Sequence, residues 1–150
     1  MLDIFVDADG CPVKQEVYGV AMRYGLKVTV VANSWMRMPP EGPIELVVVE
    51  GKFDAADDWI VEHVRENDIV VSGDIPLAAR CLDKGALVLG PAGRVFTKDS
   101  IGEALATREI LSHLRELGTI TGGPAPFDKR ARSRFLQRLD QMIQAVRTGK

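Results

Sequence analysis

The unit from which the fold is built begins near the start of the chain, in the segment Leu2-Asp3-Ile4-Phe5-Val6-Asp7-Ala8-Asp9-Gly10-Cys11-Pro12-Val13-Lys14. Its apolar part, Leu2–Val6, predicts a β-strand that ends in acidic residues. Pro12 suits the first position of a helix and Gly25 suits the residue after its last turn, so the sequence predicts a helix over Pro12–Tyr24. A strand followed closely by a helix is the unit of an α/β fold.

The same alternation of apolar runs and amphipathic stretches continues to the end of the chain. Further strands are predicted over Lys27–Ala32, Glu45–Val49, Ile69–Ser72 and Ala86–Leu89. Further helices are predicted over Asp54–Val64, Pro76–Lys84, Ser100–Leu117 and Asp128–Val146. This order predicts a three-layer α/β fold, with a mostly parallel sheet of about five strands, helices on both faces and an appended C-terminal helix. The continuous apolar runs Leu46–Val49 and Ile69–Val71 are typical of strands buried on both faces.

Length and composition indicate a globular protein of one domain. The 150 residues are expected to form a single domain, 1–150, whose last element is a basic helix in 128–150. Hydrophobic residues make up 46% and charged residues 27%, which is ordinary globular composition and argues against a disordered chain. Two cysteines are too few for a disulfide framework, and no apolar run approaches the roughly 20 residues of a membrane span. The first residues lack the features of a secretory signal, so we expect a cytoplasmic protein.

Acidic residues gather where the predicted strands end. Asp7 and Asp9 follow the first strand, and Asp74 follows the strand that begins at Ile69. Right-handed crossovers bring these two strands side by side, so Asp7 and Asp74 should face one another. Ligands bind at this edge of an open parallel sheet, where the strand order reverses. Two close carboxylates repel unless a cation neutralises them, and a site of oxygen ligands and water favours Mg²⁺ or Mn²⁺ and suits phosphate esters.

Two further acids, Asp57 and Asp58, lie in the first turn of the helix predicted after Glu45–Val49. Asp57 is nearer the apolar stripe of that helix, so it is the better candidate to point into a cleft, with Asp58 in support. Several of the acids also have a structural interpretation. Asp74 and Asp9 can cap helices, and Asp57 and Asp58 complement the helix dipole.

Polar and aromatic candidates surround the acids. Lys14 in the first helix can hold a phosphate, or can be an ordinary surface lysine. Asn33 ends the second strand on the same side as the acids. Trp35, in the loop that follows, can stack on a base if it is exposed, or can anchor the loop. Cys11 is interpreted as structural, since no histidine is near it in sequence, and Cys81 is interpreted as a core residue.

The formal net charge of −2 conceals an acidic body and a basic end. Residues 1–107 carry −7 and residues 128–150 carry +5. The cations crowd the start of the last predicted helix: Lys129, Arg130, Arg132, Arg134 and Arg138. Cations are unfavourable at a helix N-terminus, so this placement indicates an anionic partner such as the phosphates of a nucleic acid. Arg94 and Lys98 can extend the basic patch, and a salt-bridged surface helix is the alternative.

Four segments together resemble one bacterial family: Asp7–Lys14, Phe53–Ile60, Asp68–Ala78 and Gly122–Phe127. It is the YaiI/YqxD family, also called UPF0178 or DUF188. The family is similar to PIN-like domains, whose nuclease members bind divalent metal through clustered acids and hydrolyse RNA. The resemblance implies that Asp7, Asp57 and Asp74 are the metal-binding acids. The second acid usual in PIN domains, in the helix after the first strand, has only Glu16 as an equivalent.

Three functions follow as hypotheses. The first is a divalent-metal-dependent nuclease acting on single-stranded or structured RNA, with Asp7, Asp57 and Asp74 as metal ligands supported by Asp9 and Asp58. In this hypothesis the substrate is bound by Lys14, Asn33, Arg94, Lys98, Arg130 and Arg134. The second is a non-catalytic RNA-binding module on the same scaffold. The third rests on Phe5–Cys11, which looks like the first motif of haloacid dehalogenase-like phosphatases, where Asp7 would be the nucleophile and Asp9 the general acid.

Overall fold

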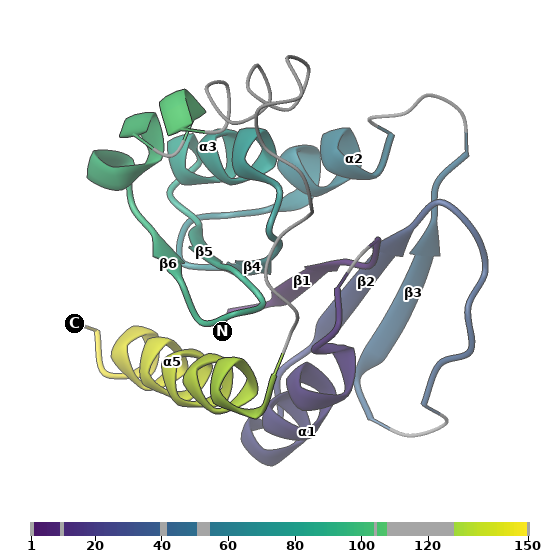
Figure 1. The fold of residues 1–150 in the computed structure, drawn as a ribbon. Coiled ribbons are helices and arrows are strands. Elements are labelled where there is room, and N and C mark those ends of the chain that lie inside the picture. The colour runs from purple at the N-terminus through teal and green to yellow at the C-terminus, as the bar shows by residue number, and fades with distance from the viewer. Residues whose placement is uncertain are drawn as a thin grey trace.

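A six-stranded sheet forms the middle layer of the protein in the computed structural model, which describes residues 2–9, 11–39, 42–50, 55–103, 105–107 and 128–149 (Figure 1). The strands are β1 (Ile4–Asp7), β2 (Val28–Ala32), β3 (Ile44–Val48), β4 (Ile69–Val71), β5 (Leu87–Leu89) and β6 (Val95–Phe96). Their order across the sheet is β3-β2-β1-β4-β5-β6. Every neighbouring pair is parallel except β5 and β6.

Helices cover both faces of this sheet, which confirms the predicted three-layer α/β fold. One face carries α1 (Lys14–Tyr24) and α5 (Lys129–Arg147), and the other carries α2 (Ala55–His63) and α3 (Ile75–Asp83) (Figure 1). Residues 98–103 and 105–107 are also helical, so the helix predicted from Ser100 starts slightly earlier. The rest of that prediction, to Leu117, and the segments 51–54 and 122–127 lie outside the described residues.

The sheet has its point of strand reversal beside β1. The chain passes from β1 to β2 and β3 on one side, then returns to β4 on the other side of β1. The predicted contact between the first strand and the strand at Ile69 is therefore confirmed, with Val6 opposite Val71. In a sheet of this kind the crevice for a ligand lies beyond the carboxyl ends of the two strands at the reversal, here β1 and β4.

Burial separates the central strands from the edges. Every residue of β1, β2 and β4 is buried, as expected for strands covered on both faces. The prediction that Leu46–Val49 is buried on both faces was wrong, because β3 is an edge strand that the helices cover only in part, and Val48 is 40% exposed. The two-residue β6 raises the number of strands above the predicted five, since a strand so short has no detectable period.

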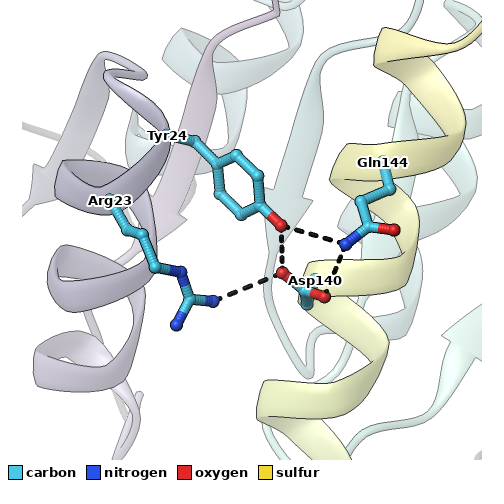
Figure 2. A network of polar contacts seen from close by, with 4 residues as sticks. All are labelled: Arg23, Tyr24, Asp140 and Gln144. Atoms are coloured by element: carbon cyan, nitrogen blue, oxygen red, sulfur yellow. Dashed lines mark hydrogen bonds and ion pairs between the residues drawn. The ribbon is translucent and has the colours of Figure 1, made fainter.

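The last helix, α5, packs against α1 instead of projecting from the domain. Its buried side chains Phe135, Leu139 and Ile143 recur every four residues and belong to the same core cluster as the buried face of α1. A polar network completes the contact, in which Asp140 of α5 accepts a hydrogen bond from the Tyr24 hydroxyl of α1 (Figure 2). The appended C-terminal helix is therefore part of the domain. In the described parts of the chain, no helix has the length and apolar character needed to cross a membrane.

Candidate active site at the carboxyl edge of the sheet

Asp7 is the last residue of β1, at the centre of the sheet and at the point of strand reversal. It lies opposite Val31 of β2 and is only 9% exposed. The Ser72 hydroxyl, just beyond the end of β4, donates a hydrogen bond of 3.0 Å to Oδ2 of Asp7. The same hydroxyl oxygen accepts a bond of 3.0 Å from the backbone N–H of Asp74. Ser72 thus links the two strand-end acids that the sequence predicts to face one another.

The surroundings of Asp7 disfavour the ionised form of its carboxyl group. Burial is the main cause of a raised pKa, and the carboxylates of Asp74 and Asp9 raise the pKa further. The hydrogen bond from Ser72 opposes this shift, because it favours the charged carboxylate. A buried carboxyl group in the negative field of two others gains electrostatic stabilisation from any cation that binds beside it.

Asp74 has the structural role that the sequence left open for it. It is the N-cap of α3, and its Oδ1 accepts a hydrogen bond of 3.0 Å from the backbone N–H of Leu77. Capping engages one oxygen of a carboxylate, so the same side chain keeps a second oxygen for another ligand. The charge of Asp74 acts on Asp7, which shows that both belong to one electrostatic cluster.

Asp9 contacts Asn33, the polar residue that the sequence predicts on the same side of the sheet. The Asn33 side-chain amide donates a hydrogen bond of 2.7 Å to Oδ2 of Asp9. Both residues are exposed, near the starts of the loops that leave β1 and β2. This bond ties the two loops together at the carboxyl edge, directly beside Asp7.

The two acids of α2 behave differently from one another. Asp58 is exposed and forms an ion pair of 2.9 Å with Arg80 of α3, so it has a structural role on the outer surface. Asp57 is partly buried, as its position beside the apolar stripe predicts. Burial raises the pKa of the Cys81 thiol to about 12, and the charges of Asp57 and Asp7 both add to that shift. The charges of Asp57 and Asp7 thus both act on the same buried thiol, that of Cys81 in α3.

The loop before α1 and the first turn of this helix contain three more titratable groups near the site. The Lys14 ammonium donates a hydrogen bond of 2.9 Å to the carbonyl oxygen of Cys11, so it folds back over the loop between β1 and α1. Burial raises the pKa of the Cys11 thiol, in agreement with a structural role for this cysteine. Glu16 pairs with Arg132 of α5 at 3.2 Å, and its other oxygen, Oε2, is buried without a hydrogen-bond partner in the described structure.

The basic end of α5 reaches the same edge of the sheet. Arg134 Nε donates a hydrogen bond of 3.3 Å to the carbonyl oxygen of Ala92, in the turn between β5 and β6. The neighbouring Pro91 lies against Gly73, since a Cβ added to Gly73 would be 3.6 Å from Pro91 Cδ. Gly73 immediately precedes Asp74, so a short series of contacts joins Arg134 to the acidic cluster.

The remaining basic candidates are at the surface near this turn or on α5. Arg94 lies over the ring of Phe96, with its guanidinium carbon 5.1 Å from the ring centroid. Lys98 and Arg130 are exposed. These positions fit a basic border around the acids, and substrate binding by any of them stays a prediction.

The structure thus brings Asp7, Asp9 and Asp74 together, and adds Ser72, which was not among the predicted nuclease residues. Its place just beyond the strand Ile69–Val71 was the available signal. Among the described residues, no group of three or more histidine, cysteine, aspartate or glutamate side chains is already arranged to hold a metal ion.

Comparison with known proteins gives relatives along the whole chain. The profile of a family described as "Uncharacterized BCR, YaiI/YqxD family" (DUF188) matches residues 5–145. A UPF0178 protein of Rhodospirillum centenum is 58% identical over all of both chains. A UPF0178 protein of Paramagnetospirillum magneticum is 55% identical over 95% of both chains, and one of Rhodospirillum rubrum is 51% identical over 99% of this chain and all of its own. No solved structure matches.

Proposed function

Starting from the membership of this chain in the YaiI/YqxD family, we propose that it is a divalent-metal-dependent nuclease that hydrolyses RNA phosphodiesters. One observation carries the proposal: carboxylates gather at the strand reversal, and the basic start of α5 lies against the neighbouring turn between β5 and β6. Asp7 and Asp74 stand at the ends of β1 and β4, and Arg134 is anchored to Ala92 at the same edge. A cation can neutralise the acids while the arginine holds a phosphate of the substrate.

The residues present fit a hard divalent cation. Asp7 is a buried carboxyl group whose pKa is raised by burial and by neighbouring acids, which is the electrostatic condition that a bound cation relieves. Glu16 Oε2 is a further buried oxygen for which the described structure offers no hydrogen-bond donor. All the candidate ligands are carboxylates, which favour Mg²⁺ or Mn²⁺. Mg²⁺ commonly retains several waters, so two or three carboxylates are sufficient ligands for it.

Each group of residues has a separate task in this proposal. Asp7 and Asp74 would hold the ion, with Asp57 from α2 as a third ligand and Asp9 in support. When bound, the ion lowers the pKa of a water molecule and stabilises negative charge on the phosphodiester. Ser72 orients Asp7 through its hydrogen bond.

The substrate would lie along the basic border of the site. Arg130 and Arg134 of α5 bind and orient the strand through its phosphates, while Lys14 and Asn33 border the acids on the other side. Arg94 and Lys98 extend this border past the turn between β5 and β6. Contacts of this kind position the nucleic acid without reading its sequence.

The decisive test is cleavage of labelled single-stranded RNA with Mn²⁺ or Mg²⁺ and with EDTA. We expect cleavage by the wild type that is lost in EDTA and falls at least about 100-fold in Asp7→Asn and Asp74→Asn, since each variant removes a charged ligand. Asparagine keeps the acceptor for Ser72 and is a good N-cap, so both variants should fold. Asp83→Asn is the matched control, because Asp83 is exposed at the far end of α3. Activity unchanged in both site variants would overturn the proposal.

A non-catalytic RNA-binding module is the second candidate function. It is favoured by the absence, among the described residues, of a preformed group of three metal-ligating side chains. A wild-type protein that binds RNA but cleaves nothing with Mn²⁺ would establish this function in place of the nuclease.

A phosphatase is the third candidate, and the bond from Ser72 to Asp7 favours it, since a nucleophilic carboxylate must be oriented and ionised. Hydrolysis of small phosphate esters, together with an acyl-phosphate trapped on Asp7, would establish this function.

A further inference from the structure

The loop that follows β2 starts beside the candidate active site and presents an aromatic side chain to solvent. Trp35 is 76% exposed, the largest exposed fraction among the large hydrophobic residues that the structure describes as exposed. Most tryptophans are largely buried, and burial of the indole stabilises the folded state, whereas an exposed indole makes no such contribution. The indole of Trp35 is therefore accessible to a ligand.

The loop is held in place at several points along its length. At its start, the Asn33 side chain bonds to Asp9 at 2.7 Å. Further along, Met36 and Met38 are partly buried and pack against the core cluster beneath α1. Trp35 is consequently part of an anchored segment. The residues that anchor the loop are Met36 and Met38, so Trp35 does not have this role.

The alternation of buried and exposed residues gives the loop two chemically distinct sides. Met36 and Met38 face inward, whereas Trp35 and Arg37 are both exposed. Exposure alternates from residue to residue over 35–38, as it does in an extended segment, and this alternation assigns the indole and the guanidinium to the outer side. An aromatic face next to a cation suits a base attached to a phosphate.

The start of the loop also places it at the proposed active site. It begins after Ala32 at the carboxyl end of β2, and Val31 lies opposite Asp7 in the parallel register. The Ala8 N–H, directly after Asp7, bonds to the Val31 carbonyl at 3.0 Å. A strand of nucleic acid with one phosphate at Asp7 would therefore place a neighbouring nucleotide close to the start of this loop.

We propose that Trp35 and Arg37 form a binding site for an unpaired nucleotide of single-stranded RNA, with the indole stacked on the base and the guanidinium on a phosphate. The proposal rests on the RNA-directed part of the proposed function and narrows the substrate to single strands. In a duplex each base is already stacked on its neighbours, so its face is closed to a side chain.

Tryptophan fluorescence tests the stacking without any need for catalysis. The chain has two tryptophans, and Trp59 is packed against His63 with ring centroids 3.8 Å apart. A Trp59→Phe variant therefore retains Trp35 as its single indole reporter. In EDTA, we expect an oligouridylate of about ten nucleotides to quench its emission saturably, and a duplex of equal length to quench it far less.

Affinity measured by anisotropy of the labelled oligouridylate gives the second readout. Trp35→Ala should raise Kd roughly 5- to 150-fold, because it removes the aromatic face on which the base stacks. Trp35→Phe should recover part of this affinity, because it keeps a smaller aromatic face. Arg37→Ala should reduce the slope of log affinity against log salt by about 0.7, the value for one phosphate contact on a single strand. The matched controls are Met22→Ala, another exposed apolar side chain, and Arg65→Ala, an exposed arginine before the amino end of β4. Both should bind like the wild type.

Three outcomes would overturn the inference: equal affinity of Trp35→Ala and wild type, equal quenching by duplex and single strand, or a Trp35 emission that changes with protein concentration alone. The last outcome, confirmed by sedimentation, would assign the indole to an interface between copies of the chain. The result is separable from that of the cleavage assay. Quenching without cleavage would refute the nuclease function and support the nucleotide-binding site. Cleavage together with unchanged RNA affinity of the Trp35→Ala variant would support the nuclease function and refute the nucleotide-binding site.

Discussion

Tyr24 at the end of α1 donates its hydroxyl hydrogen to the carboxylate of Asp140 in α5, which joins two residues 116 positions apart in the chain (Figure 2). Gln144 donates to the other Asp140 oxygen at 3.0 Å, and Arg23 pairs with the carboxylate at 3.3 Å. This network holds the middle of α5 on α1, and so helps to keep the arginines at the start of α5 beside the sheet edge.

Removing the Tyr24 hydroxyl should loosen this contact. We expect Tyr24→Phe to lower the free energy of unfolding by about 1 kcal/mol, less than a fully buried bond to a charged group contributes, because Asp140 is partly exposed. Urea denaturation followed by circular dichroism measures the change.

Tyr18 on the same helix provides the matched control. Its hydroxyl is buried and finds no hydrogen-bond partner within the described structure. Tyr18→Phe should therefore leave stability unchanged or raise it by up to about 1 kcal/mol, since an unsatisfied polar atom is removed. Equal losses in the two variants would contradict the role given to the Tyr24 hydroxyl.

Gly93 is a second point on which the placement of α5 depends. Its φ of +92° is a conformation that side chains rarely adopt, and an added Cβ would lie 2.7 Å from Arg134 Cβ and 2.9 Å from the Arg134 backbone. We expect Gly93→Ala to cost about 2 kcal/mol in unfolding free energy and to weaken RNA binding, because the start of α5 must shift away from the turn. Urea denaturation and anisotropy with labelled RNA measure the two effects.

Gly19→Ala is the control for that substitution. Gly19 lies within α1, and a Cβ added there meets nothing within 4 Å. Alanine should stabilise the helix by about 0.5–1 kcal/mol. If Gly93→Ala behaved like Gly19→Ala, the close packing of α5 on the turn would be refuted.

The metal-free protein should respond to pH through Asp7. Burial raises the pKa of this carboxyl group above its ordinary value of 3.8, so the folded state retains the proton to higher pH than the unfolded chain. Ionising Asp7 therefore costs folding free energy, and this cost appears as the pH rises from 3.8 through the raised pKa. In EDTA, we expect Asp7→Asn to be more stable than the wild type at about pH 7, with the gain vanishing as the pH approaches 3.8.

Urea midpoints across this pH range measure the difference between Asp7→Asn and wild type. Asp83→Asn should show no such pH-dependent gain, since its side chain is exposed to water. A wild-type protein more stable than Asp7→Asn at every pH would mean that the Ser72 hydrogen bond outweighs the burial of the charge.

Addition of metal should reverse the order of these stabilities. A ligand present at roughly 100 times its Kd stabilises the folded state by about 2.7 kcal/mol, so Mn²⁺ should raise the wild-type Tm by several degrees. The shift should be abolished by EDTA and should be much smaller in Asp7→Asn and Asp74→Asn, as measured by differential scanning fluorimetry. An equal shift in all variants would place the ion elsewhere.

Much of the arrangement at the candidate site was accessible from local sequence. The acid after an apolar strand identified Asp7, and the rule of right-handed crossovers placed it next to the strand that precedes Asp74. Ser72 was missed as the link between them, because its role depends on an interstrand distance that no local pattern contains. The engagement of Asp58 by Arg80 was missed for the same reason, since these residues belong to two different helices.

Alternating apolar runs, helix-terminating glycines and the position of charges along the chain are local properties, and they specify the α/β class, the element order and the acids at strand ends. Tertiary packing alone decides that β3 is a half-exposed edge strand, that α5 lies on α1, and that Arg134 reaches the turn beside Asp74. The physical reason is that these outcomes depend on which surfaces bury one another, and the residues concerned are far apart along the chain.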